Sequence, residues 1–187
     1  MNKLITLGAA FLVCLSSLSD AKPVPQNEQI AVDIRRTTLI VNDAEKSLGL
    51  YRDALGLKVI YDQLINSPMD NGETRSRRLV LMRANDDFIG AIGLLQYIHP
   101  KKPQRYETFE EPVPGDPIIV INASDLERRW SKVASSPGVR VISPPEILTY
   151  PRANGGKISV NQTMIRDPDG YWIEVNQLLD KPASDKD

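Results

Sequence analysis

Hydrophobic and polar positions along the chain form two blocks with the same order of elements. In the first block, residues 35–42 alternate into an apolar strand. Leu48, Tyr51 and Leu55 then follow at positions i, i+3 and i+7, which predicts one apolar stripe on a helix. Three further segments have the composition of strands: 57–64, 78–83 and 90–97. The first block is therefore predicted to be a strand, a helix and three strands.

The predicted helix of this block has sequence signals at both ends. Asn42 and Glu45 have the spacing of a capping box, which predicts that Asn42 opens the helix. Gly56 predicts a left-handed stop, because glycine adopts a positive φ without steric cost. A turn at residues 85–87 separates the last two strands of the block.

The same order of elements returns in the second half of the chain. Residues 118–122 form the first predicted strand, and Ser124 with Glu127 has capping-box spacing for a helix. The apolar stripe of that helix consists of Leu126, Trp130 and Val133. The remaining predicted segments are the strands 139–143, 158–165 and 171–178, a loop rich in proline and glycine at 144–156, and a turn at 167–170.

The two blocks superimpose at one constant offset in the numbering. Leu39 then matches Val120 (120 − 39 = 81), and the triplet 92–94 matches the triplet 173–175 (173 − 92 = 81). This agreement in element order and length predicts an internal duplication. A single α+β sheet with two similar helices is the alternative.

The start of the chain, residues 1–21, has the pattern of a secretory signal peptide. Lys3 supplies the positive start, residues 4–15 are apolar, and Ser19-x-Ala21 fits the small-x-small cleavage rule. The apolar run is shorter than the roughly 20 residues that span a bilayer. We expect export to the periplasm or the medium, and no membrane attachment after cleavage.

Composition narrows the classes of partner and chemistry. The formal net charge of −1 gives no sign of nucleic-acid binding, so a small molecule is the expected partner. Cys14 is the only cysteine and lies within the leader. The exported chain would therefore have no disulfide, cysteine nucleophile or thiolate metal site.

These patterns divide the chain into six segments. They are the leader 1–21, a linker 22–33, a first module 34–98, an inter-module linker 99–115 with four prolines, a second module 116–179 and a polar tail 180–187.

Two motifs resemble those of one known family. They are Val-Asn-Asp-Ala-Glu-Lys-Ser-Leu-Gly-Leu-Tyr-Arg-Asp-Ala-Leu-Gly-Leu-Lys-Val at 41–59 and Arg-Asp-Pro-Asp-Gly-Tyr-Trp-Ile-Glu at 166–174. These two motifs occur in this order in a chain with an internal duplication. In this arrangement they resemble the motifs of the vicinal oxygen chelate superfamily, which includes glyoxalases, bleomycin-resistance proteins and extradiol dioxygenases. The resemblance covers residues 34–179. It implies an α+β fold of two paired βαβββ modules, whose sheets form a cupped half-barrel around a substrate cavity.

The resemblance also implies where a metal would bind. In metal-dependent members, the first and last strands of each module supply one ligand apiece, typically His, Gln or Glu. The positions carried over are Arg36, Gly93, Pro117 with its neighbours Asp116 and Ile118, and Glu174. Only Glu174 is a usual ligand, and Asp116 would add a carboxylate if the fifth strand shifted by one residue. Zn, Ni, Fe or Mn would need three or four donors, so we expect no metal cofactor.

Four side chains are the candidates for the chemistry of the cavity. Arg36 could bind an anionic substrate or form an ion pair with Glu174, which would otherwise be a catalytic carboxylate. His99 could serve as an acid or base, or be a solvated loop residue. Trp172 shares the face of Glu174 by strand alternation, so it lines the cavity or packs in the core.

Two charged groups lie outside these positions. Arg75, Arg77, Arg78 and Arg83 lie on or beside the third strand, where they attract an anion or form a solvated face. The aspartates of the turn at 167–170 are expected to stabilise that turn.

Three functions remain open, and whether the chain is an enzyme is not decided. The first is metal-independent binding of a small organic molecule in the cupped sheet, as in drug-resistance members of the family. The second is a glyoxalase I-like lyase or isomerase, or a dioxygenase-type enzyme, in which Glu174 acts with Asp116, His99 or a partner chain. The third is a structural or interaction module, because proteins of this family often form homodimers by exchanging modules.

Overall fold

The computed structural model describes residues 24–104, 110–152 and 155–180. The chain divides into two units. Residues 31–180 form the larger one, and the described part of the other is a short segment with the 3-10 helix η1 (Gln26–Glu28). The predicted leader lies outside the described residues. In the described parts, no helix has the length and hydropathy that a membrane-spanning helix needs.

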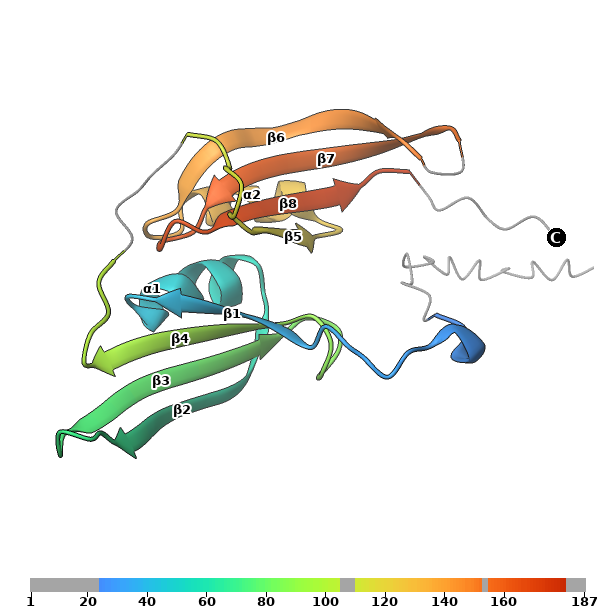
Figure 1. The fold of residues 1–187 in the computed structure, drawn as a ribbon. Coiled ribbons are helices and arrows are strands. Elements are labelled where there is room, and N and C mark those ends of the chain that lie inside the picture. Colours follow the sequence, from blue (N-terminus) through green and yellow to red (C-terminus); the bar gives the residue numbers. More distant parts are fainter. Residues whose placement is uncertain (1–23, 105–109, 153–154, 181–187) are drawn as a thin grey trace, which may run out of the picture. The chain divides into compact units, whose positions relative to one another are not determined.

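The larger unit consists of two βαβββ modules (Figure 1). The first contains β1 (Arg36–Val41), α1 (Ala44–Leu48), the π-helical turn η2 (Gly49–Ala54), β2 (Lys58–Pro68), β3 (Thr74–Arg83) and β4 (Ala91–His99). The second contains β5 (Ile118–Asn122), α2 (Leu126–Ala134), β6 (Arg140–Pro151), β7 (Lys157–Arg166) and β8 (Trp172–Leu178). The predicted α+β fold of two such modules is confirmed.

Each module contributes one four-stranded mixed sheet. The strand orders are β1-β4-β3-β2 and β5-β8-β7-β6. The first strand of each module pairs in parallel with the last, and the other pairs are antiparallel. The first and last strands of a module are thus neighbours, which brings their outward side chains together.

One hydrophobic core joins the two modules. It contains the inward side chains of both sheets, such as Leu39 and Ile173, together with Tyr51 and Leu126 from the helical segments. The α2 helix packs on η2 and on β6 and β8 of its own sheet, and α1 packs on β4. Each sheet therefore has an inner face toward this core and an outer face away from it.

Strand alternation assigns the candidate residues to the outer faces. Leu39 and Val41 are buried in the core, so Arg36 lies on the outer face of the first sheet. Ile173 and Val175 are buried in the same way, so Glu174 lies on the outer face of the second sheet.

The helix starts differ by one residue from the prediction. Asp43, and not Asn42, caps α1, and its carboxylate accepts hydrogen bonds from the backbone N–H groups of Glu45 and Lys46. Asp125, and not Ser124, occupies the equivalent position before α2. Each pair of neighbours consists of two good capping residues, so residue type could not choose between them. Gly56 has a φ of +80°, as the predicted left-handed stop requires.

Strand pairing corrects the alignment of the two halves. Arg36 pairs with Ala91, and Ile118 pairs with Trp172. The last strands keep the predicted offset (172 − 91 = 81), whereas the first strands exceed it by one (118 − 36 = 82). The counterpart of Arg36 is therefore Ile118, not Pro117 or Asp116. The match of Leu39 to Val120 was wrong by one residue, because the continuous apolar run of β5 has no alternation to fix its register.

The predicted loop at 144–156 is largely strand. β6 continues to Pro151 and pairs along its length with β7. Pro144 and Pro145 coincide with a register irregularity between Ser143 and Glu146, on a strand at the edge of its sheet. Proline is compatible with an edge strand or a bulge because no ladder hydrogen bond is lost there.

Candidate functional site

Arg36 and Gly93 occupy adjoining positions on the outer face of the first sheet. A Cβ atom built on Gly93 would lie 3.2 Å from Cδ of Arg36 and 3.0 Å from Oγ1 of Thr38. These distances are shorter than ordinary van der Waals contacts. The aliphatic part of Arg36 therefore occupies the space that a larger side chain at Gly93 would need.

The rest of this outer face combines apolar and cationic groups. Leu79, Leu81 and Leu95 are half-buried on the neighbouring strands and form an apolar floor. Arg77 lies on the same face, directly opposite Tyr97. The Nε atom of Arg77 is buried and has no hydrogen-bond partner among the described residues. The face thus presents two guanidinium groups beside an apolar surface.

The outer face of the second sheet is polar. Oε1 of Glu174 accepts a hydrogen bond from Nδ2 of Asn176 at 2.6 Å. The Oδ1 atom of Asn176 is buried without a hydrogen-bond partner in the described part of the chain. The Tyr150 hydroxyl donates to Oε1 of Gln162 at 2.8 Å. This face can therefore both donate to and accept from a polar molecule.

The four positions that would hold a metal do not fit one. They carry Arg36, Gly93, Ile118 and Glu174, of which only the last offers a donor atom suited to a divalent cation. Within the described ranges, no group of three or more His, Cys, Asp or Glu side chains converges. The guanidinium of Arg36 is permanently charged and would repel a cation.

Arg36 and Glu174 are not brought together within one chain. They lie on the outer faces of two different sheets, with the common core between them. Among the described residues no ion pair joins them.

Asp116 and Trp172 contact one another near the start of β5. Oδ2 of Asp116 accepts from the backbone N–H of Val113 and from the indole Nε1 of Trp172, at 3.2 and 3.3 Å. The Trp172 ring is 2% exposed, and the guanidinium of Arg166 lies 3.9 Å from its centroid. Trp172 is thus enclosed by protein groups on the outer face that it shares with Glu174.

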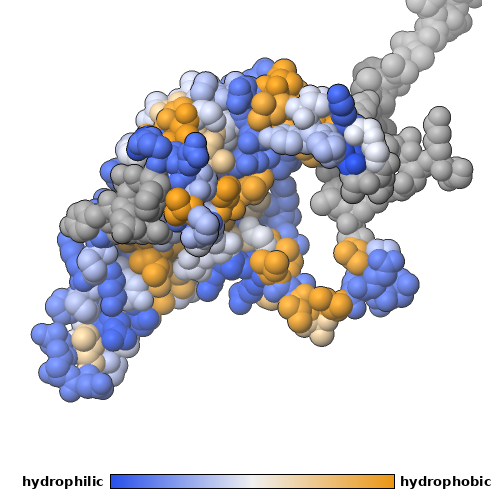
Figure 2. Space-filling view, turned by 45° about the horizontal axis from the view of Figure 1, so that its top comes forward, coloured by the Kyte–Doolittle hydropathy of each residue, from blue (hydrophilic) through white to orange (hydrophobic). Residues whose placement is uncertain are grey.

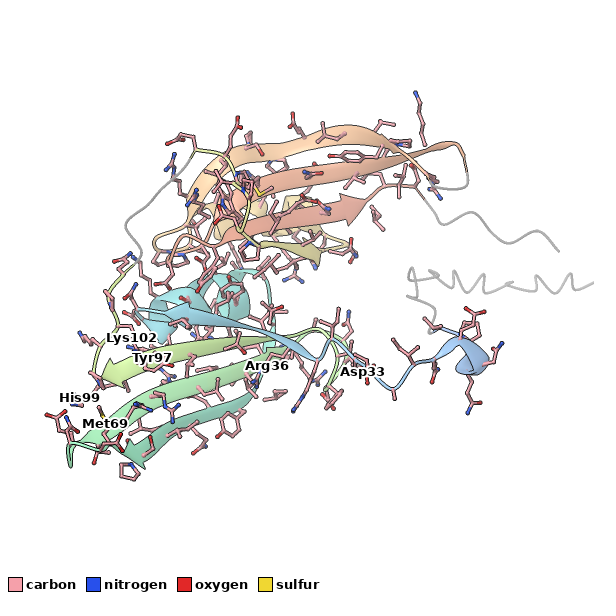
Figure 3. All side chains as sticks on the ribbon, in the orientation of Figure 1. Asp33, Arg36, Met69, Tyr97, His99 and Lys102 are labelled. Atoms are coloured by element: carbon pink, nitrogen blue, oxygen red, sulfur yellow. The ribbon has the colours of Figure 1, made fainter. Side chains whose placement is uncertain are left out.

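His99 lies far from the ligand-equivalent positions. It ends β4, whereas Arg36 pairs with Ala91 at the start of the same strand. Eight residues of strand separate the two ends, which corresponds to roughly 25 Å. His99 is exposed, and its Nε2 lies 3.4 Å from a carboxylate oxygen of Glu73, close to the β2–β3 turn that holds Met69 (Figure 3).

The aspartates of the turn before β8 also bind the first module. Asp167 stabilises the turn as predicted, because its Oδ1 accepts from the backbone N–H groups of Asp169 and Tyr171. Oδ1 of Asp169 accepts from both the backbone N–H and Nδ2 of Asn42, at 2.9 and 2.8 Å, and Oδ2 accepts from the hydroxyl of Ser47. Asp167 accepts from the buried hydroxyl of Tyr51 at 2.9 Å. Burial raises the pKa of Asp167 to about 6. The turn therefore joins the modules.

A cavity of about 310 Å³ also lies where the modules meet, at the end of β1. Its lining includes Lys101 and Lys102, which follow β4. Both lysines fall within the predicted linker 99–115, where no sequence pattern marks them as part of a site. Proximity of that segment to β1 and to the turn before β8 depends on tertiary structure.

The chain is similar to proteins of one family. A family model described as Glyoxalase/Bleomycin resistance protein/Dioxygenase superfamily matches residues 33–175. A glyoxalase family protein from Bacillus cereus has a TM-score of 0.62 and 12% identity, covering 83% of this chain and 100% of that one. The antibiotic-binding protein TnmS3 from Streptomyces sp. CB03234 has a TM-score of 0.48 and 20% identity, covering 80% and 99%. No curated protein sequence matches the chain. At these identities, the structural similarities concern the fold.

Proposed function

The chain belongs to the Glyoxalase/Bleomycin resistance protein/Dioxygenase superfamily, and on this premise we propose that it is an exported, metal-independent binder of a small organic anion. The observation that carries the proposal is the position of Arg36 over Gly93. A cationic side chain occupies the place that the family resemblance assigns to metal ligands. The molecule would therefore be held through its negative charge and not through a metal.

The composition of the outer face supports an anion with an apolar body. Guanidinium groups bind carboxylates by paired, charge-assisted hydrogen bonds. Arg36 supplies one such group beside Gly93, and the leucine floor offers apolar contact. Such a combination of apolar surface and a few polar groups is typical of small-molecule sites.

The test is titration with 2-naphthoate, a two-ring carboxylate, followed by calorimetry. We expect Arg36→Ala to weaken binding by about tenfold or more, because it removes a charge-assisted hydrogen bond. Arg128→Ala is the matched control, because Arg128 is an exposed arginine on α2, outside the outer face. Equal losses in the two variants, or no binding to the parent protein, would contradict the proposal.

Metal content provides a second check on the same site. Stoichiometric Zn, Ni, Fe or Mn in the purified exported chain, lost in the Glu174→Ala variant, would contradict metal-independent binding. Elemental analysis of the parent and variant proteins decides this point.

A glyoxalase-like lyase or isomerase is the alternative, and the placement of Glu174 favours it. The carboxylate is half-buried and held by Asn176, as a positioned base would be. Turnover of the hemithioacetal of methylglyoxal and glutathione, with loss of activity in Glu174→Gln, would support this reading. Absence of turnover both with and without added Ni or Zn would exclude it.

We further propose a homodimer in which the first sheet of one copy faces the second sheet of its partner. Ile40 and Val120 are 51% and 59% exposed on the two outer faces. Arg36 and Arg77 give the first face positive charge, whereas Glu146 and Glu174 give the second negative charge. Hydrophobic residues also form separate surface patches in Figure 2. Such a dimer would unite residues that one chain keeps apart.

Light scattering after size-exclusion chromatography tests the dimer. Val120→Glu should shift the protein toward the monomer, because it places a charge on an apolar contact. Ile147→Glu is the control, at an exposed apolar position on β6. A parent protein that remains monomeric at high concentration would contradict the proposed dimer.

Export is proposed from the pattern of residues 1–21 alone. Expression of the full chain in a bacterial host should give a periplasmic protein whose first residue is Lys22. Retention of the uncleaved chain in the cytoplasm would contradict export.

A further inference from the structure

We propose that the cavity at the end of β1 is a second binding site, for a small aromatic acid, at a distance along β1 from the position of Arg36. Its lining residues come from both modules: β1 supplies Ile40 and Asn42, β4 supplies Tyr97, and the turn before β8 supplies Tyr171. Residues 101–104 complete the wall. The site lies about four residues of strand from Arg36, or roughly 13 Å.

The base of this cavity is held by hydrogen bonds that cross between the modules. The Tyr171 hydroxyl accepts from the backbone N–H of Ile40 at 3.1 Å and donates to its carbonyl at 3.2 Å. Asn42 donates twice to Asp169. These contacts fix the relative positions of two lining segments. The cavity is therefore preorganised, which reduces the entropic cost of binding.

The charge of the lining favours an anion. Lys101 and Lys102 contribute two ammonium groups, and no ion pair joins either to a carboxylate within the part of the chain that the structure describes. Asp169 is the only acidic side chain in the lining, and its oxygens already accept three hydrogen bonds from Asn42 and Ser47. The ammonium groups are thus the available charged donors for a ligand.

The apolar part of the lining favours an aromatic ring. Tyr97, Tyr171 and Ile40 line the cavity beside the lysines. Nζ of Lys102 lies 5.3 Å from the centroid of the Tyr97 ring, so a cation and an aromatic surface are adjacent (Figure 3). A volume of about 310 Å³ is at the lower end of small-molecule sites, which fits a one-ring acid.

Titrations followed by backbone amide NMR test this site with four probes: benzoate, phenyl phosphate, inorganic phosphate and benzyl alcohol. We expect both aromatic acids to shift the amide signals of Asn42, Lys102 and Gly170. Inorganic phosphate lacks the ring and benzyl alcohol lacks the charge, so both should bind at least about tenfold more weakly. Equal binding of inorganic phosphate and phenyl phosphate would overturn the assignment to aromatic acids.

Paired substitutions locate the binding. Lys101→Ala combined with Lys102→Ala should raise the Kd for benzoate about tenfold or more. Lys58→Ala combined with Lys157→Ala, at two exposed lysines elsewhere, should change it less than about twofold. The charge-conserving pair Lys101→Arg and Lys102→Arg should retain binding. Amide spectra show directly whether each variant is folded.

The outcomes separate this site from the proposed site at Arg36. Shifts confined to Thr38 and Gly93, with a Kd that depends on Arg36 and not on the lysines, would support the Arg36 site and overturn the second site. Binding that depends on the lysines and not on Arg36 would support the second site. No response to either aromatic acid would also overturn it.

Discussion

At the scale of single residues, the main feature is the dependence of Arg36 on Gly93. A Cβ atom on Gly93 would lie 3.2 Å from Cδ of the arginine, so the absence of a side chain at Gly93 allows the arginine this position without crowding. Two positions that the family resemblance treats as independent ligands are thus one steric unit here. A substitution at one of them should change the effect of a substitution at the other.

A double-mutant cycle tests this dependence. Gly93→Ala should destabilise the parent protein more than it destabilises an Arg36→Ala variant, with a coupling of about 0.5–1 kcal/mol. The free energies of unfolding in urea provide the four values of the cycle. Strictly additive effects would show that Arg36 does not occupy the space above Gly93.

Asp167 should make stability depend on pH. Its pKa is raised to about 6 in the folded chain by burial, against about 3.9 for an unfolded chain. Because the pKa is higher in the folded chain, protonated Asp167 favours the folded state. Its contribution to stability is complete below the pKa of the unfolded chain and is lost as the pH rises through about 6. The stability of the parent relative to Asp167→Asn should therefore fall by on the order of 3 kcal/mol between about pH 4 and pH 7.

Urea unfolding of both proteins across that range measures this difference. Asp53→Asn is the control of opposite sign, because its hydrogen bond with Arg52 lowers the pKa of Asp53. The contribution of Asp53 is therefore lost as pH falls. A difference between parent and Asp167→Asn that does not vary with pH would contradict the expectation for Asp167.

At the scale of elements, the duplication extends to the side chains that support each helix start. Oε1 of Gln96 on β4 accepts from the backbone N–H of Ala44 at 3.1 Å, and Oε1 of Gln177 on β8 accepts from that of Leu126 at 3.0 Å. The two glutamines are related by the same offset as the last strands (177 − 96 = 81). The first N–H groups of a helix lack partners within it, so both bonds satisfy a group that would otherwise be unpaired.

Substitution of these glutamines tests their shared role. Gln96→Met and Gln177→Met keep the length of the side chain and remove the acceptor, so each should lower the free energy of unfolding by about 1 kcal/mol. The effects should add, because the residues lie in different modules. Chemical denaturation measures them, with Gln63→Met at an exposed position on β2 as the control. Losses no larger than that of the control would contradict a supporting role.

At the scale of the whole molecule, the single core predicts that the modules unfold together. Leu48 is 1% exposed in the first module, and both tryptophans, Trp130 and Trp172, belong to the second. Leu48→Ala should cost about 2–5 kcal/mol by leaving a cavity. Tryptophan fluorescence and circular dichroism should then report the same lowered midpoint.

Leu64→Ala is the control for this experiment, because Leu64 is 57% exposed on β2. It should shift the midpoint far less. A tryptophan transition that Leu48→Ala leaves in place would show that the second module unfolds independently of the first.

Part of the candidate site could be predicted from the sequence. The periodicity of Leu39, Val41, Ile173 and Val175 fixes which faces are buried, because a side chain on every second residue of a strand points the same way. The resemblance of the two motifs assigned Arg36 and Glu174 to ligand-equivalent positions on the first and last strands, and it implied the loss of most donor residues.

Sequence by itself thus determined the duplicated βαβββ order, because that order depends on local periodicity. It also determined the residue types at the positions that the family resemblance marks as ligands. The tertiary structure decided the register of β5, since the run Ile118–Ile121 is apolar on both faces and only its pairing with β8 sets its phase. It also decided that Arg36 and Glu174 lie on opposite outer faces and that Asp167, Asp169 and the lysines after β4 meet the first module. These contacts and positions involve residues far apart in the chain. They arise from long-range packing, which a local sequence pattern does not predict.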